Sequence, residues 1–145
     1  MDLLPNFLTN VMSIYQANKI EGRCFTVFLR EDSILQIDID ENSYFEKKDF
    51  EELRDAAGLI GKGEKFLNLI KVGKGTLLDD KARKLSSSVE GCIYKLADAF
   101  VITSYAQQLI ANFIIIMNRP PVPTSFFTDE DEAVKWLKEL QLKDQ

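Results

Sequence analysis

The stretch of sequence that decides the fold is Phe66-Leu67-Asn68-Leu69-Ile70-Lys71-Val72, which is apolar apart from Asn68 and Lys71. A short apolar run of this kind is typical of a β-strand that is covered on both faces, and such strands belong to parallel sheets. A second run, Leu96-Ala97-Asp98-Ala99-Phe100-Val101-Ile102-Thr103, has the same character. We therefore expect two buried parallel strands in the fold.

Patterns typical of helices lie between and around these strands. One helix is expected to begin at a capping box formed by Ser43 and Glu46 and to end at Ile60, where two glycines follow. Thr76 is expected to cap a second helix that continues to about residue 87. Further helices are expected at residues 3–16, 88–94, 104–118 and 128–140.

A hairpin precedes the first of the helices that connect the strands. Alternate residues of two neighbouring segments are apolar, namely Phe25, Val27 and Leu29 in the first and Leu35, Ile37 and Ile39 in the second. This period of two predicts strands, and the short polar link Glu31-Asp32-Ser33 makes them an antiparallel pair. A last short strand is expected at residues 125–127, after prolines that force an extended chain.

The resulting order of elements is α-β-β-α-β-α-β-α-β-α, and strands separated by helices indicate parallel pairing. The expected fold class is α/β, with a mixed, mostly parallel five-stranded sheet and an antiparallel edge hairpin. We expect one domain over residues 1–145, with its core at 23–140. Residues 1–18 are expected to form an amphipathic helix that docks on protein, because no basic residue precedes Lys19.

The composition excludes several classes of function. The sequence contains no histidine, so it lacks Ser–His and Cys–His nucleophile pairs and the commonest metal ligand. The net charge of −5 argues against nucleic-acid binding, which needs a basic face. The two cysteines, Cys24 and Cys92, are expected to be small buried hydrophobes. We expect no catalytic residues, no metal site and no cofactor.

The sequence also indicates neither secretion nor membrane insertion. The apolar residues near the N-terminus follow no basic region, which argues against a secretory signal. The most apolar stretch, residues 109–117, is far shorter than the roughly 20 residues that span a bilayer. The expected location is the cytoplasm.

Three groups of residues carry a family resemblance. They are Val72-Gly73-Lys74-Gly75-Thr76 with Asp80-Lys81-Ala82-Arg83, Asn112-Phe113 with Asn118-Arg119-Pro120-Pro121-Val122-Pro123-Thr124, and Phe127-Thr128 with Glu132-Ala133-Val134-Lys135-Trp136-Leu137. With the order of elements, they resemble the STAS fold, also called SpoIIAA-like. More narrowly, the chain resembles uncharacterised bacterial STAS-like proteins, which share this fold with CRAL-TRIO lipid-binding domains.

The chain departs from the STAS regulators at their phosphorylation site. These regulators carry a phosphorylatable serine at the start of the helix after the third strand. Here the corresponding residues are Leu78-Asp79-Asp80-Lys81-Ala82, which contain no hydroxyl group. Switching by a kinase therefore does not carry over from the resemblance.

The loop Gly73-Lys74-Gly75-Thr76 is the candidate ligand-binding site. Ligands of open α/β sheets bind beyond the carboxyl ends of the strands, and the N–H groups of a glycine-rich turn favour an anion. Lys74 adds positive charge, whereas Asp79 and Asp80 repel a phosphate. The alternative is a structural turn, in which the glycines take positive φ and Thr76 caps a helix.

The helix expected at residues 104–118 has an apolar arc wider than one packing face. The residues that widen it are Leu109, Ile114, Ile115 and Ile116. Exposed apolar patches usually mark protein interfaces, so these four are the candidate interface of a homodimer. Alternatively, the N-terminal helix covers them within one chain.

Two functions fit these observations. The first is a non-enzymatic STAS-like regulatory or protein-interaction module that self-associates or binds another protein partner. The alternative is a small-molecule carrier, which binds an anion or a lipid-like ligand at the loop 73–76 or in a hydrophobic cleft. An enzyme is disfavoured, because loose carboxylates and lysines occur in every protein.

Self-association predicts that Ile115→Lys lowers the molar mass of the native species from dimer to monomer, because the substitution puts a charge into an apolar interface. Size-exclusion chromatography with light scattering measures this mass. A wild-type chain that is monomeric at high concentration, with the same mass as Ile115→Lys, contradicts the prediction.

Overall fold

The computed structural model describes residues 18–103 and 119–143. Within them, the main sheet has six strands in the order β1-β2-β3-β5-β7-β8. These strands are β1 (Lys19–Glu21), β2 (Phe25–Leu29), β3 (Ile34–Ile39), β5 (Phe66–Val72), β7 (Lys95–Val101) and β8 (Thr124–Phe127). The first three pair antiparallel, whereas β3, β5, β7 and β8 pair parallel. The predicted mixed, mostly parallel sheet with an antiparallel edge hairpin is confirmed.

Two details of the predicted sheet are wrong. The main sheet has six strands rather than five, because β1 adds to the edge of the hairpin and is too short to show a period in the sequence. A separate pair of short parallel strands, β4 (Tyr44–Phe45) and β6 (Leu77–Leu78), lies beside the main sheet. Pairing in β6 keeps the chain extended after Thr76, so helix α3 begins later than predicted and spans Asp80–Ser86.

Helix α2 spans Lys47–Ile60 and ends at Gly61 as predicted, where the Gly61 N–H donates to the Ala57 carbonyl at 2.9 Å. The capping box at its start is formed by Glu46 and Asp49, three residues after the predicted pair Ser43 and Glu46. Asp49 Oδ2 accepts the backbone N–H of Glu46 at 2.9 Å, whereas the Ser43 hydroxyl donates to the Asp40 carbonyl. The remaining described helices are the 3-10 turn η1 (Glu90–Cys92) and α5 (Glu130–Lys143).

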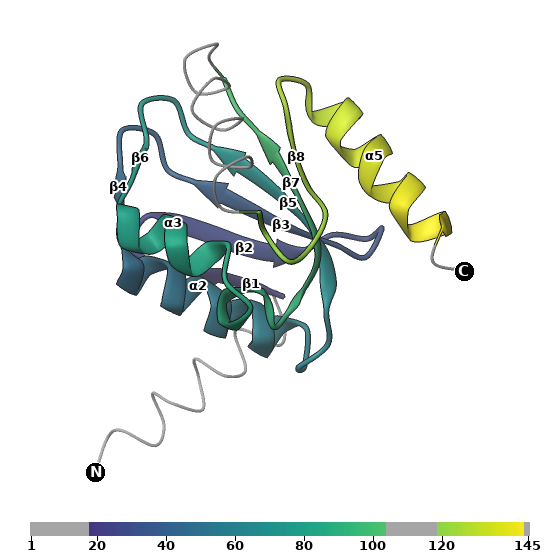
Figure 1. Cartoon of the computed structure of the whole chain (residues 1–145), viewed down its shortest axis with the longest axis horizontal. Helices are drawn as coiled ribbons and strands as arrows, with labels where there is room; N and C mark the ends of the chain where they lie inside the picture. The colour runs from purple at the N-terminus through teal and green to yellow at the C-terminus, as the bar shows by residue number, and fades with distance from the viewer. Residues whose placement is uncertain (1–17, 104–118, 144–145) are drawn as a thin grey trace.

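The two faces of the sheet are covered by different helices (Figure 1). Helix α5 packs on one face, where Leu69, Ala99 and Leu137 are fully buried. Helix α2 packs on the other face, against the side chains of β2 and β3 that the alternating pattern assigned to the core, and α3 lies beside it (Figure 1). The two central apolar strands are therefore covered on both sides, as their composition predicted. No described helix is long and apolar enough to cross a bilayer.

A half-buried ion pair, with Asp49 buried and Arg23 half exposed, ties the start of α2 to the start of the hairpin. Arg23 donates from Nη2 to Asp49 Oδ2 at 2.5 Å and from Nε to Asp49 Oδ1 at 3.0 Å. The same guanidinium donates to the Tyr44 carbonyl at 2.8 Å, which adds β4 to the contact. The hydrogen bonds that Asp49 accepts from Arg23 and from the Glu46 backbone lower the pKa of the Asp49 carboxyl, although its burial alone would raise that pKa.

We expect Asp49→Asn to lower the free energy of unfolding at neutral pH by about 1–3 kcal/mol, because a charged hydrogen-bond partner is lost. A carboxyl whose pKa is lowered by folding stabilises the protein above its unfolded pKa of about 3.9, and this contribution disappears as the pH falls through the folded value. The variant should therefore lose less stability on acidification than the wild type. Urea unfolding over an acid series measures both effects.

The matched control is Asp55→Asn on the same helix, where the side chain is 71% exposed. We expect this change to alter stability by less than about 0.5 kcal/mol. If both variants lose the same free energy of unfolding, the ion pair between Arg23 and Asp49 stabilises the protein no more than an exposed carboxylate does.

Candidate functional site

A cavity of about 340 Å³ lies between the sheet and the layer formed by α2, α3, β4 and β6. Its floor is the face of β3, β5 and β7 that points away from α5, together with the adjoining part of β8. Helix α2 contributes Phe50, Leu53 and Ala57 to the opposite wall, and α3 contributes Ala82. Most of the described lining is apolar.

Pairing between the strands arranges the floor in rows. One row is Asn68, Asp98 and Thr124, which follow one another across β5, β7 and β8. The next row is Ile37, Ile70, Phe100 and Phe126 across β3, β5, β7 and β8, and the last two rings stack with centroids 4.8 Å apart. A polar row therefore lies directly beside an apolar one, and together they make the floor amphipathic.

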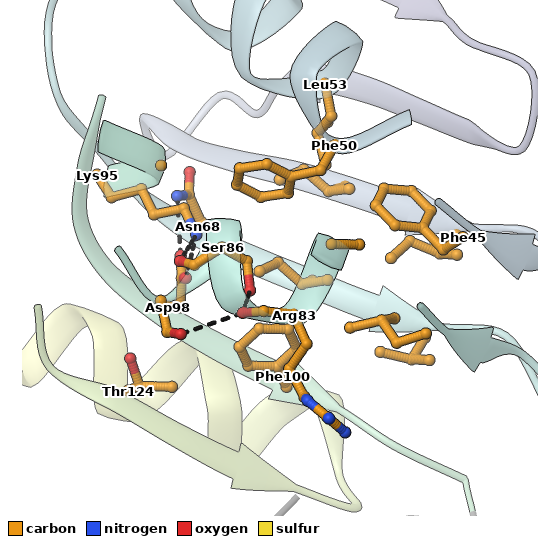
Figure 2. Close-up of a pocket in the computed structure, with 18 of the residues that line it drawn as sticks. Phe45, Phe50, Leu53, Asn68, Arg83, Ser86, Lys95, Asp98, Phe100 and Thr124 are labelled. Atoms are coloured by element: carbon orange, nitrogen blue, oxygen red, sulfur yellow. Dashed lines mark hydrogen bonds and ion pairs between the residues drawn. The ribbon is translucent and has the colours of Figure 1, made fainter. Parts of the chain in front are cut away.

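The polar row carries a compact hydrogen-bonded cluster (Figure 2). Asn68 Nδ2 donates to Asp98 Oδ1 at 3.0 Å, and Lys95 Nζ donates to Asp98 Oδ2 at 2.7 Å. Lys95 also donates to the Ser86 carbonyl at 3.4 Å, and its Nζ lies 5.2 Å from the centre of the Phe50 ring. The cluster is well buried, since Asn68 is 2% and Asp98 3% exposed.

A bulge in β7 brings Lys95 into this cluster. In a regular strand, residues three apart point to opposite faces, which would separate Lys95 from Asp98. The register shifts beside Phe66, which pairs with Lys95, while Leu67 pairs with Ala97 and Leu96 is passed over. Bulges of this kind redirect side chains, and here the result is a Lys–Asp ion pair on one face.

One atom of the cluster has no partner. Asn68 Oδ1 is buried and accepts no hydrogen bond from any group in residues 18–103 and 119–143. The carboxylate of Asp98 can only accept, so the Asn68 amide must turn its nitrogen toward Asp98, and the oxygen is the end that remains. A buried acceptor without a donor is costly, which makes Asn68 Oδ1 the most unusual polar atom of this cluster.

Three hydroxyls around the cavity are satisfied by the protein itself. The hydroxyls of Ser86 and Ser87 both donate to the Arg83 carbonyl within α3, at 2.9 and 3.1 Å. The Thr124 hydroxyl donates to the Val122 carbonyl at 3.0 Å. Behind the cavity wall, burial raises the pKa of the Cys92 thiol, and its Sγ lies 3.4 Å from the Ser86 carbonyl.

The predicted loop Gly73-Lys74-Gly75-Thr76 lies at the carboxyl end of β5, and only Thr76 of the four lines the cavity. The Thr76 hydroxyl donates to the Asp40 carbonyl at 2.6 Å, so it does not cap a helix as predicted. The N–H groups of Gly73 and Thr76 donate to the carbonyls of Ile39 and Gly73. Gly75 has the expected positive φ of 77°, and Lys74 is exposed. Anion binding at this loop stays a prediction.

The predicted interface residues Leu109, Ile114, Ile115 and Ile116, and the docking helix expected at residues 1–18, lie outside the described residues apart from Asn18. Both cysteines are buried and free, in agreement with the prediction.

Sequence analysis missed the cluster of Asn68, Lys95 and Asp98. Two of these residues did leave a signal, since Asn68 and Asp98 are polar residues inside runs that are otherwise apolar. A buried polar residue needs a partner, so two such residues on neighbouring strands could have been paired as a hypothesis. Lys95 left no such signal, because its orientation depends on the bulge.

We expect Asp98→Leu to lower the free energy of unfolding by about 3–5 kcal/mol, because it leaves the buried charge of Lys95 without its carboxylate. Adding Lys95→Met should recover part of this loss, with a coupling energy of about 1–3 kcal/mol in a double-mutant cycle measured by urea unfolding.

The matched control is the exposed pair Lys71–Glu130 on the α5 side, 3.4 Å apart, with both side chains 41% exposed. The cycle Lys71→Met with Glu130→Leu should give a coupling energy below about 1 kcal/mol. A coupling energy near zero between Lys95 and Asp98 would contradict the geometry of the cluster.

Comparison with known proteins supports the fold. Among solved structures, the chain is similar to an uncharacterised protein of the DUF3478 family with a SpoIIAA-like fold from Shewanella loihica PV-4. The TM-score is 0.57 at 15% sequence identity, and the match covers 81% of this chain and 98% of the other. The SpoIIAA-like fold predicted from the sequence is thereby confirmed.

A comparison with curated proteins gives no significant match. A family model described as "Domain of unknown function (DUF7793)" matches residues 28–141, which include the whole floor of the cavity. The chain therefore belongs to the family of domains of unknown function DUF7793.

Proposed function

We propose that this chain is a non-enzymatic module that binds a small, largely apolar molecule in the cavity between the sheet and helices α2 and α3. The observation that carries the proposal is the cavity itself. Its volume of about 340 Å³ falls within the range of roughly 300–1,000 Å³ that is typical of ligand sites. Such sites combine apolar walls with a few converging polar groups, as this one does.

The size of the cavity also argues that it is more than loose packing. Protein interiors are close-packed, and apolar cavity volume costs roughly 24 cal/mol per Å³. A ligand that packs against these walls supplies the contacts that the protein does not make with itself.

The chemistry of the lining supports binding over catalysis. Lys95 is engaged by Asp98 and by the Ser86 carbonyl, so its amine is not offered as a nucleophile. Burial raises the pKa of the nearby Cys92 thiol, which disfavours the reactive thiolate. These groups form a fixed platform instead of a nucleophile with its base.

A regulatory role through protein contact is the second candidate, and one observation favours it. Leu77 and Leu78 of β6 line the cavity and are also 66% and 37% exposed. Tyr44 on the paired strand β4 is 51% exposed. A ligand in the cavity would touch the same strand that presents these side chains to solvent, so ligand binding could be communicated to a partner there.

The binding proposal predicts that the neutral dye N-phenylnaphthylamine, which fluoresces in apolar surroundings, binds the full-length chain with saturable fluorescence. Ala57→Leu and Ala82→Val fill the cavity from α2 and α3, and each should weaken dye binding by about tenfold or more because the space is lost. Fluorescence titration measures the affinity, and thermal unfolding without dye confirms that each variant is folded.

The matched control is Asp55→Leu, which adds the same side chain as Ala57→Leu at an exposed position of α2. It should leave the dye affinity unchanged. If the dye does not bind, or if folded Ala57→Leu and Ala82→Val bind it as well as the wild type, the cavity is not a ligand site.

A further inference from the structure

We propose that two copies of this chain pair through the edge strand β8, and that this pairing brings Phe126 of each copy to the cavity of the other. The completion of the cavity rests on the proposed function, whereas the strand pairing does not depend on it. The surface differs from the interface predicted within residues 109–116. Two observations support the proposal: the open edge of β8 and its position at the end of the cavity floor.

Strand β8 is the last strand of the main sheet, and β7 is its one neighbour within the described part of the chain (Figure 1). The Pro123 and Phe127 carbonyls accept N–H groups from the β7 side. Alternate residues of a strand direct their backbone groups to opposite sides, so Thr124 and Phe126 point theirs away from β7. Among the described residues, no backbone group pairs with them. These N–H and C=O groups are a template for another extended chain.

The side chains of β8 do not protect this edge. Edge strands commonly resist pairing through charged side chains, prolines or bulges. The four residues Thr124–Phe127 include no charge and no proline, and they pair with β7 without a shift of register. The opposite edge, β1, does carry charged side chains, at Lys19 and Glu21. The short length of β8 limits the contact to a small pair of strands.

A second copy of β8 fits this edge because the edge is self-complementary. When two copies run antiparallel about a two-fold axis at Ser125, Thr124 of one copy lies opposite Phe126 of the other. In that register, both outward residues of each strand donate and accept hydrogen bonds. The opposed side chains are uncharged, so no like charges meet across the axis. Two-fold dimers are also the commonest oligomers of soluble proteins.

The same register places a side chain of the second copy at the cavity. Opposed residues of an antiparallel pair point to the same face of the sheet, and Thr124 and Phe126 both line the cavity. Phe126 of the second copy therefore continues the row of Asn68, Asp98 and Thr124 across the axis. In one copy the floor of the cavity ends at β8, and the second copy extends it with an aromatic ring.

A charge at the proposed axis tests the pairing. Ser125 is half-buried and is not among the described residues that line the cavity. Ser125→Lys and Ser125→Glu each place like charges opposite one another, so each variant alone should have the mass of a monomer at a concentration where the wild type is a dimer. An equimolar mixture should recover the dimer, because lysine then faces glutamate. Size-exclusion chromatography with light scattering measures the mass of the full-length chain.

Thr124→Pro and Thr124→Val are a matched pair at the edge itself. Proline removes an outward N–H without removing a bond to β7, and edge strands tolerate proline there, whereas valine keeps the N–H. Only Thr124→Pro should become monomeric. A monomeric wild type at high concentration, single Ser125 variants that stay dimeric, or a mixture that stays monomeric would each overturn the proposal. Should Thr124→Pro not fold, the mixture of Ser125 variants decides alone.

A dye titration separates the completed cavity from the proposed function. N-phenylnaphthylamine should bind the monomeric Ser125→Lys variant about threefold to tenfold more weakly than the wild type, because the contact with Phe126 of the second copy is lost. The equimolar mixture should restore the affinity. Equal affinity in monomer and dimer would overturn the completion of the cavity by a second copy. If the dye binds no form of the chain, the proposed function fails, and the mass measurements still decide the pairing of β8.

Discussion

Strands β5 and β7 lie in the interior of the sheet, and the requirement that both of their faces be covered shapes the rest of the molecule. Alternation along the strands directs Leu69 and Ala99 toward α5. On that face Ala133 and Leu137 of the helix are fully buried, and the buried part of the contact is apolar. On the opposite face, α2 and α3 cover the sheet without filling the space above Ile70, and the cavity lies there.

The polar residues of the core are found only on the side of this cavity, among the described central strands. Buried amides and charges reduce stability unless they are hydrogen-bonded, and an apolar substitute of similar size often serves a core equally well. Asn68, Lys95 and Asp98 satisfy one another except at Asn68 Oδ1. The hydrogen bonds of this cluster are satisfied except at one atom, and the cluster lies where α2 and α3 leave a cavity above the sheet. A role in ligand binding explains such a cluster more easily than a contribution to stability does.

The layer above the cavity is held at both ends by polar contacts. Arg23 and Asp49 join the start of α2 to the hairpin, and the Thr76 hydroxyl joins the carboxyl end of β5 to Asp40 after β3. Gly73 allows the ends of β3 and β5 to come close, since a Cβ atom there would lie 2.6 Å from the Ile39 carbonyl oxygen. The loop predicted as an anion site therefore has a structural role that its sequence only partly disclosed. These contacts position α2, β4 and β6 as fixed walls.

The sequence by itself determined the α/β class, the hairpin, the buried strands and the end of α2, because hydrophobic periodicity and helix-ending glycines act between residues that are close along the chain. It did not reveal β1, β4 or β6, which are too short to have a period and exist only through their partners. The tertiary structure alone decided the site. Asn68 meets Asp98 through the register of two strands, and Lys95 joins them because a bulge reverses the face to which it points. Local patterns along one strand contain neither the register nor the bulge, so side chains that are distant in sequence were brought together by packing.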